Sequence, residues 1–527
     1  MTTEFKLTYS TMFDPPPELH VRFEAALDAI RAHLGGEHAM LIGGRDERAP
    51  RQFSVRSPID TRDELGRFQA GEDVHAHAAV AAAGKAYPPW AATRWQERVR
   101  ILRRAVALIE ARVYFIGAAL ALEVGKNRME ALGEAQETAD LIGYYCDQME
   151  RNDGFVQPMA PDPLSGFVSE NVSVMKPYGV WLVIAPFNFP LALSGGPAGA
   201  ALVAGNTVVF KAASATAWSG RLLTDALRDA GVPPGVFNFV TGPGGSLGEA
   251  LIRHPGVAGV TFTGSYGVGM HLYRTFAGSR WPRPCIAEMG GKNAAIVSRH
   301  GNLDDAATGI ARSAFGLSGQ KCSACSRVYV EHTVFADVVA ALHAATARIS
   351  VGDPTRRQHW MGPVIDASAV ARFEDAAAQI HAVGEAGSIV HGGERLDHGD
   401  LGHGYYCAPT IARAPLAHPL WQTELFAPFV LVAPVETLEE ALAHANASDY
   451  GLTAGFYGST EETERFFEGI EAGVCYANRP QGATTGAWPG YQPFGGWKGS
   501  GSTGKAGGSR YYVTQYLREQ SQTRVRR

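Results

Sequence analysis

The chain has 527 residues, of which 46% are hydrophobic and 19% are charged. This length exceeds what one hydrophobic core organises and predicts about three folding units, while the composition excludes a mostly disordered protein. The formal net charge of -5 gives no broad basic field, so nucleic acid is not an expected partner.

Residues 177–210 contain no charged side chain, a stretch long enough to span a membrane. Pro186, Pro190, Pro197 and the adjacent Gly195 and Gly196 would interrupt a lipid-facing helix. We therefore expect a strand, a turn and a buried helix here, and no membrane partner. The first twenty residues are charged and proline-containing, and the six cysteines are widely scattered. Both features predict a cytoplasmic protein with reduced thiols.

Residues 73–149 are rich in Ala, Glu, Arg and Leu with helical apolar spacing, which predicts a helical N-terminal layer. Residues 152–179 contain several prolines followed by an alternating apolar pattern, which indicates an extended hairpin. Tyr511, Tyr512, Val513 and Tyr516 are also expected to be extended and to pair with this hairpin. Such a ribbon often packs on another subunit, so we expect a homo-oligomer, a dimer or larger.

Short apolar runs alternate with helical segments in the middle of the chain. Strands are expected at residues 180–185, 207–210, 236–240, 260–262 and 285–288, and then at 294–297, 328–330 and 429–435. This alternation is typical of parallel sheets with crossover helices. The predicted fold class is therefore α/β, with two α/β domains.

Two glycine-rich turns, 241–248 and 263–269, each follow an expected strand and precede an expected helix. Backbone amides at such a point can bind phosphate. The G-x-G-x-x-G fingerprint is absent from the sequence, and ordinary glycine turns explain either loop equally well.

Cys322 lies in a loop of small residues and forms a C-x-x-C pair with Cys325. An exposed thiolate is a nucleophile when a base, a cation or backbone amides activate it. Structural zinc usually needs four ligands, and no second pair is present, so no metal is expected. Two buried structural thiols are the other alternative.

Glu288 ends an apolar strand, where partial desolvation raises a carboxyl pKa and suits it for general-base work. A surface glutamate at a strand end is the alternative. Asn188 lies between Pro186 and Pro190, either as a turn residue or as an amide that stabilises an oxyanion.

Together these pieces resemble the aldehyde dehydrogenase family, from about residue 55 to the C-terminus. The resemblance depends on seven motifs in order, which occupy residues 186–190, 210–211, 262–265, 288–292, 319–322, 424–426 and 493–496. It implies a Rossmann-type cofactor domain at 1–151 and 179–289, a catalytic domain at 290–498, and a β oligomerisation flap at 152–178 and 509–527.

The resemblance also implies residue roles. Cys322 is the nucleophile, Asn188 and the Cys322 amide hold the oxyanion, and Glu288 activates the water that hydrolyses a thioester. Residues expected to contact the cofactor are Lys211, Ser214, Gly264, Ser265, Glu424 and Phe426. NAD is the expected cofactor. Ser214 stands where many NAD-preferring relatives carry Glu, so NADP remains an alternative.

Ser323 and the 485–496 loop resemble the 1-pyrroline-5-carboxylate dehydrogenase branch, which oxidises L-glutamate γ-semialdehyde to L-glutamate. In that branch, a serine and the amides of a Gly-Ala pair, here Gly486 and Ala487, hold the substrate carboxylate. Phe189 and Phe494 would line the pocket around the aliphatic part of the substrate, or they would simply pack in the hydrophobic core. The sequence departs from the usual pattern at Ala212, Ala427 and Trp488-Pro489.

Three alternatives remain at this point. The first is an aldehyde dehydrogenase for another semialdehyde or an aromatic aldehyde, with Trp488 reshaping the pocket. The second is a non-catalytic structural or binding homologue. The third is a piece of a bifunctional proline-utilisation enzyme, and the chain is too short to include that enzyme's proline dehydrogenase barrel.

Overall fold

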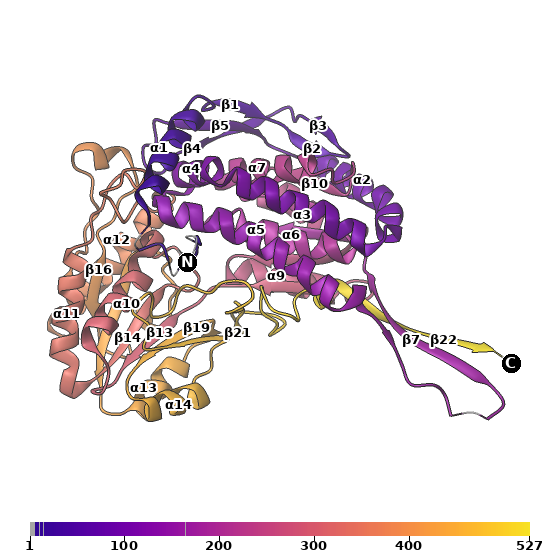
Figure 1. Cartoon of the computed structure of the whole chain (residues 1–527). Helices are drawn as coiled ribbons and strands as arrows, with labels where there is room; N and C mark the ends of the chain where they lie inside the picture. The colour runs from indigo at the N-terminus through magenta and orange to yellow at the C-terminus, as the bar shows by residue number, and fades with distance from the viewer. Residues whose placement is uncertain (1–5, 10, 14, 164, 527) are drawn as a thin grey trace.

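The computed structural model describes residues 6–9, 11–13, 15–163 and 165–526. Two seven-stranded sheets form the centres of two α/β units, and a narrow three-stranded ribbon projects from one of them (Figure 1). The α/β fold class expected from the sequence is confirmed.

The N-terminal part is helical, as the sequence predicts for residues 73–149. The helices are α1 (Pro17–Arg31), α2 (Asp73–Ala92), α3 (Trp95–Ala111), α4 (Val113–Val124) and α5 (Arg128–Arg151). A small sheet precedes α2 and has the order β1 (Gly36–His38), β5 (Glu64–Gln69), β4 (Gln52–Arg56). This sheet is not expected from the sequence, because β1 and β4 are short and largely exposed and none of its strands is a continuous apolar run.

The first large sheet has the order β12-β11-β8-β9-β10-β2-β3. Its parallel strands are β8 (Val180–Ile184), β9 (Thr207–Lys211), β10 (Phe237–Val240), β11 (Val257–Thr263) and β12 (Cys285–Glu288), and its antiparallel edge is β2 (Met40–Ile42) and β3 (Arg45–Glu47). All five strands expected between residues 179 and 289 are confirmed. Alternate residues of β8 pack into two different cores, Trp181 into one and Leu182 into the other, so helices cover both faces.

The uncharged stretch at 177–210 folds as expected into β8, a turn and the buried helix α6 (Ala192–Ala204), followed by β9. Within the described ranges no single helix has the length and apolarity to cross a membrane; α3 and α4, bent by 69°, meet that criterion as a pair. The other crossover helices here are α7 (Ala217–Asp229), α8 (Glu249–Arg253) and α9 (Tyr266–Ala277).

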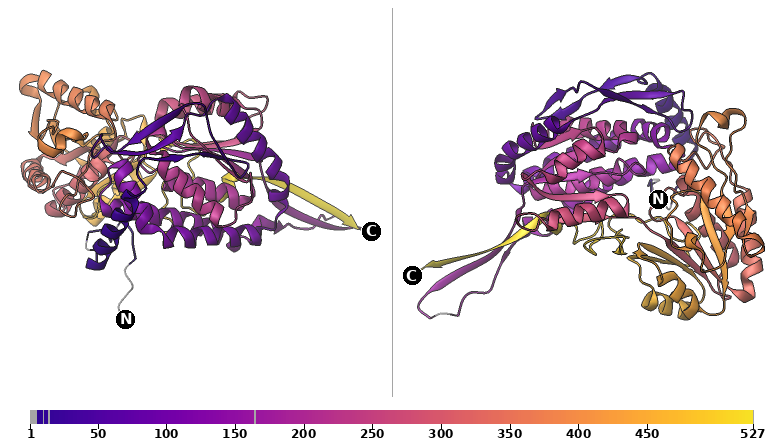
Figure 2. Two further views of the ribbon diagram at one scale, coloured as in Figure 1. Left: turned by 90° about the horizontal axis from the view of Figure 1, so that it is seen from above. Right: turned by 180° about the vertical axis from the view of Figure 1, so that it is seen from behind.

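The second large sheet has the order β15-β16-β17-β14-β13-β19-β20. Its strands are β13 (Asn293–Val297), β14 (Cys325–Glu331), β15 (Ser388–His391), β16 (Thr410–Arg413), β17 (Phe429–Val435), β19 (Thr453–Tyr457) and β20 (Val474–Ala477). Its helices are α10 (Leu303–Phe315), α11 (Phe335–Ala347), α12 (Ala367–Ala382), α13 (Leu438–Asn446) and α14 (Thr460–Gly469). The two units lie side by side, and the ribbon projects from the first unit on the side away from the second (Figure 2).

The projecting ribbon, called the flap, consists of β6 (Val156–Pro158), β7 (Val168–Pro177) and β22 (Leu517–Arg526). All ten residues of β22 pair antiparallel with β7, so the pairing with the hairpin is made by the residues that follow Tyr516 and not by Tyr511–Tyr516. The expectation of an extended chain at Tyr511–Tyr516 is wrong, since this stretch is a turn followed by a 3-10 helix. Tyr512 and Tyr516 are buried and pack on Tyr145 and Trp181, which a strand in the flap could not do.

Candidate active site

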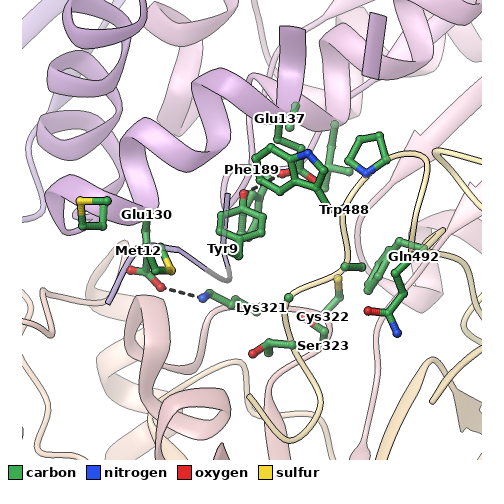
Figure 3. A pocket seen from close by; sticks show the side chains of 18 of the residues that line it. Tyr9, Met12, Glu130, Glu137, Phe189, Lys321, Cys322, Ser323, Trp488 and Gln492 are labelled. Carbon is green, nitrogen blue, oxygen red and sulfur yellow. Dashed lines mark hydrogen bonds and ion pairs between the residues drawn. The ribbon is translucent and has the colours of Figure 1, made fainter. Parts of the chain in front are cut away.

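A cavity of about 310 Å³ lies between the two α/β units (Figure 3). It has the size of a small-molecule site. Seven residues predicted from the sequence line it together: Phe189, Glu288, Cys322, Ser323, Gly486, Ala487 and Phe494. They come from the loops after β8 and β12, the loop before β14, and the long loop after β20.

The backbone before Cys322 is unusual. Leu317, Ser318 and Gly319 have φ values of 50°, 54° and 68°, so three successive residues are left-handed. A Cβ on Gly319 would lie 2.1 Å from the Ala427 carbonyl oxygen, which explains why glycine is required there. Left-handed non-glycine residues persist only where surrounding structure holds them. The loop therefore presents Cys322 in one fixed position.

Hydrogen bonds hold the chain on both sides of the thiol. Asn293 Nδ2 donates to the Cys322 carbonyl oxygen at 2.7 Å, and Thr484 Oγ1 donates to the Ser323 carbonyl oxygen at 2.6 Å. Asn188 is buried, and its Nδ2 donates to the Gln320 carbonyl oxygen at 2.9 Å. Asn188 is thus tied to the loop of Cys322, although its side chain is not one of those that line the cavity.

Glu288 occupies the last position of β12, as predicted. Burial raises the pKa of its carboxyl to about 8, and a hydrogen bond from the Gly496 amide at 3.2 Å opposes this rise. Burial also raises the pKa of the Cys322 thiol to about 12, with further contributions from the charges of Glu424 and Glu288. In the protein without ligands, the thiol is therefore protonated at neutral pH and the carboxyl is half-ionised near pH 8.

Ser323, Gly486 and Ala487 face the cavity from two loops. Gly486 has φ 112°, a backbone conformation that residues with a Cβ rarely adopt, and it lies against the Arg479 guanidinium. The Lys126 ammonium lies 3.4 Å from the centroid of the Phe189 ring and is itself paired with Glu134 at 2.5 Å. Phe189 is thus held in a cation-π contact at the cavity wall.

The residues predicted to bind the cofactor lie away from this cavity. Lys211 ends β9 and is buried, and burial lowers its pKa to about 8. Its ammonium donates to the Ala212 carbonyl oxygen at 3.3 Å, and no carboxylate pairs with it among the described residues. A buried cation without a counter-ion is costly unless a ligand compensates it.

The remaining cofactor candidates lie in both units: Ser214, Gly264 and Ser265 follow strands of the first sheet, and Glu424 and Phe426 precede β17 of the second. Ser265 precedes α9 and makes no side-chain cap, while the Gly264 amide donates to the Glu288 carbonyl oxygen at 3.1 Å. Ser214 is exposed in a short 3-10 helix. Glu424 and Phe426 line a second, small hollow behind Cys322, where Glu424 accepts a hydrogen bond from the Gly291 amide at 2.9 Å.

Several cavity residues were not predicted. Tyr9, Met12 and Phe13 come from the N-terminal segment, and Tyr145 and Tyr512 contribute two further aromatic rings. Lys321, next to the thiol, forms an ion pair with Glu130 at 2.6 Å. No sequence pattern connects residues so far apart in the chain; Trp488, noted above as a departure, is the exception and also lines the cavity.

All six cysteines are free thiols. Across the described residues, no group of three or more His, Cys, Asp and Glu side chains is arranged to hold a metal ion.

Residues 45–521 match the Aldehyde dehydrogenase family. The chain belongs to this family. It is 36% identical over 498 residues to a 1-pyrroline-5-carboxylate dehydrogenase of Geobacillus thermodenitrificans, covering 93% of this chain and 94% of the relative. A relative named 1-pyrroline-5-carboxylate dehydrogenase 1, from Halalkalibacterium halodurans, is 37% identical over 501 residues, with 93% of each chain covered.

Solved structures agree with the fold of this family member. A Thermus 1-pyrroline-5-carboxylate dehydrogenase with bound NAD superposes with a TM-score of 0.91 at 32% identity, covering 99% of this chain and all of the other. Proline utilization A from Bdellovibrio bacteriovorus superposes with a TM-score of 0.89 at 33% identity over 96% of this chain. The aldehyde dehydrogenase described here spans about half the length of that larger chain, 52%.

Proposed function

We propose that the chain oxidises an aldehyde to a carboxylic acid with NAD, and that the aldehyde is L-glutamate γ-semialdehyde, formed from 1-pyrroline-5-carboxylate in proline catabolism. One observation carries this proposal. The Cys322 thiol, the Glu288 carboxyl and the Ser323, Gly486 and Ala487 loop positions line the same cavity. A nucleophile, a base and an anion-binding loop are what this reaction requires.

In the proposed mechanism, Cys322 Sγ attacks the aldehyde carbon and forms a C–S bond. The Asn188 amide and the Cys322 backbone N–H donate to the resulting oxyanion. NAD bound by the residues proposed below would supply a hydride acceptor, and loss of hydride from this carbon would convert the thiohemiacetal into a thioester. Glu288 then takes a proton from water, the hydroxide attacks the thioester carbon, and the C–S bond breaks to release the acid and the thiolate.

Glu288 also suits an earlier step. A thiol whose pKa burial raises to about 12 must lose its proton before it attacks, and the Glu288 carboxylate lines the same cavity. With its own pKa raised to about 8 by burial, Glu288 is a stronger base than an ordinary carboxylate. Glu288 would have to release the thiol proton to solvent before it accepts the proton of the water, so that the thiol and the water use the same carboxylate in turn.

Lys211, Ser214, Gly264, Ser265, Glu424 and Phe426 are proposed to hold the cofactor. The unpaired buried ammonium of Lys211 supports this assignment, because ribose hydroxyls or a phosphate would satisfy it. The glycines of the turn at 244–245 also leave open space, since a Cβ at either would meet no atom within 4 Å. The exposed Ser214 leaves NADP as an alternative.

The names of the relatives support the choice of aldehyde. So does the loop at residues 485–496, called the anchor loop here. In the proposed complex, Ser323 Oγ and the Gly486 and Ala487 amides bind the substrate carboxylate, and Phe189 and Phe494 contact its methylenes. The buried indole of Trp488 in the same cavity favours a second candidate, an aromatic aldehyde.

The domain division is likewise proposed. Residues 1–151 with 179–289 would bind the cofactor, 290–498 would carry catalysis, and 152–178 with 509–527 would form the flap. Of these, residues 1–5, 10, 14, 164 and 527 lie outside the described ranges.

We also propose a homo-oligomer and a cytoplasmic location. Exposed apolar side chains on the flap, Val156, Val168 and Val525, support the first. Six free thiols support the second.

The test is NADH formation with pyrroline-5-carboxylate, benzaldehyde and a series of linear aldehydes. We expect the highest kcat/KM for pyrroline-5-carboxylate, and its loss in Cys322→Ala. Activity on other aldehydes alone would overturn the substrate but keep the mechanism. No activity on any aldehyde would favour a non-catalytic homologue.

A further inference from the structure

The N-terminal segment forms part of the cavity wall. Its described residues, 6–9 and 11–13, are called the strap here. Tyr9, Met12 and Phe13 of the strap line the same cavity as Cys322. Figure 3 shows Tyr9 pointing between the Glu130–Lys321 ion pair on one side and Phe189 with Trp488 on the other.

Tyr9 makes directed contacts at both ends of its side chain. Its hydroxyl donates to Glu137 Oε2 at 2.6 Å. Its ring meets Trp488 edge-on with centroids 5.2 Å apart, and Phe189 in the same manner at 6.3 Å. Both distances lie in the favourable range for aromatic pairs. The phenol therefore has a defined orientation beside two residues assigned to the substrate pocket.

Helix α5 has a glycine where the ring of Tyr9 approaches. A Cβ on Gly133 would lie 2.8 Å from Tyr9 Cε1, which is too close for any other residue without a shift. Glycine inside a helix costs about 1 kcal/mol relative to alanine. This close fit is a second observation, independent of the cavity, that the strap belongs against α5.

The rest of the strap is tied down in the same way. The Arg312 guanidinium lies 3.6 Å from the centroid of the Phe13 ring, and Thr11 Oγ1 donates to the Lys6 carbonyl oxygen at 2.6 Å. Lys6 Nζ and Trp488 Nε1 both approach Asp140 Oδ2, at 3.7 and 2.8 Å. The strap and the anchor loop thus share one attachment point on α5.

We propose that Tyr9 is a specificity-determining residue of the aldehyde pocket. Its ring fills the space beside Phe189 and Trp488 that the carbon chain of a longer aldehyde would need. The selection is by size, through the ring, and the hydroxyl serves to hold the ring in place. This inference rests on the proposed function only in taking the cavity at Cys322 as the aldehyde site.

The test compares kcat/KM for hexanal and propanal in purified full-length protein. These substrates lack a carboxylate, so the result does not depend on the identity of the natural aldehyde. Tyr9→Ala is expected to raise the hexanal-to-propanal ratio at least ~10-fold, since each methylene in an apolar pocket is worth roughly 10-fold or more in specificity. Tyr9→Phe is expected to stay within about twofold of the parent, and so is Tyr511→Ala, an exposed tyrosine outside the cavity.

An unchanged ratio in Tyr9→Ala would overturn the inference, as would an equal change in Tyr9→Phe, which would assign selection to the hydrogen bond with Glu137. If Tyr9→Ala does not fold, Tyr9→Leu supplies a smaller side chain that keeps apolar packing, and the same ratio decides. Failure of the proposed substrate is distinguishable, because pyrroline-5-carboxylate would be a poor substrate of the parent protein while the aldehyde ratio still responds to Tyr9.

Discussion

The two walls of the cavity are built differently. Backbone conformation fixes the wall that carries Cys322. Leu317 and Ser318 are left-handed, Gly319 packs against the Ala427 carbonyl oxygen, and side chains donate hydrogen bonds to the backbone carbonyl oxygens of the loop. The opposite wall consists of side chains from the strap and α5 together with Trp488, held by ring contacts and hydrogen bonds. Backbone geometry tolerates little change, whereas side chains can be exchanged one at a time. We therefore assign reaction geometry to the first wall and choice of aldehyde to the second.

The largest effect is expected at the thiol. Cys322→Ala should reduce kcat by at least about 10⁴-fold, because the covalent intermediate cannot form. Cys325→Ala is the matched control, since Cys325 is a buried cysteine three residues away that does not line the cavity. Steady-state NADH formation measures both. Comparable losses of kcat in the two variants would mean that disturbed packing of the loop, and not loss of the thiol nucleophile, causes the effect.

Glu288→Gln should lower kcat by roughly 10²- to 10⁴-fold, the usual contribution of a general base. The sign of the pH dependence follows from the pKa of about 8 that burial gives this carboxyl. Below that pH the carboxyl is protonated and cannot accept a proton, so kcat of the parent should rise as pH increases through about 8. A pH profile of the variant that keeps this rise would show that another group titrates.

Ser323→Ala tests the carboxylate anchor on the first wall. Loss of one hydroxyl donor to a charged acceptor costs about 1.5–3 kcal/mol, so kcat/KM for pyrroline-5-carboxylate should fall by roughly 10- to 100-fold. The value for propanal, which has no carboxylate, should change little. Equal losses for both substrates would contradict the anchor.

The smallest effect is expected on the second wall. Trp488→Phe removes the indole N–H that donates to Asp140 at 2.8 Å and should reduce the free energy of unfolding by about 1.5 kcal/mol, the lower end for a bond to a charged group, because Asp140 is partly exposed. Urea denaturation measures this change, with Trp497→Phe as the control because Trp497 is half-exposed. A loss of several kcal/mol would show that this wall is as rigid as the first.

The sequence predicts the large sheets well, because their central strands are continuous apolar runs. The bounds of β12 and β17 match the expected residues 285–288 and 429–435. The small β1-β5-β4 sheet was missed because its strands are short and lack that pattern. Tyr511, Tyr512 and Tyr516 have high strand propensity, yet packing of Tyr512 on Tyr145 takes precedence over local preference.

The residues on the first wall could be anticipated because they fall within local motifs, with Cys322, Ser323 and Glu288 each inside a short run of glycines and small side chains. The second wall could not. Tyr9 reaches the cavity through tertiary packing alone, and no motif in residues 6–13 predicts that it lines the cavity. One signal existed on the partner helix: Gly133, within the Ala- and Glu-rich helix α5, marks a close approach by another part of the chain.

The flap makes the state of assembly readable by amide hydrogen exchange. In the three-stranded ribbon, β22 is an edge strand, and its ten residues pair with β7 on one side. The amides of β22 that point away from β7 face solvent in a monomer. Their hydrogens would then exchange with deuterium at the rate of unprotected amides. If a second subunit covers that edge, the same amides become protected, and the protection would weaken on dilution. The flap therefore serves as a built-in reporter of subunit association that needs no label and no substrate.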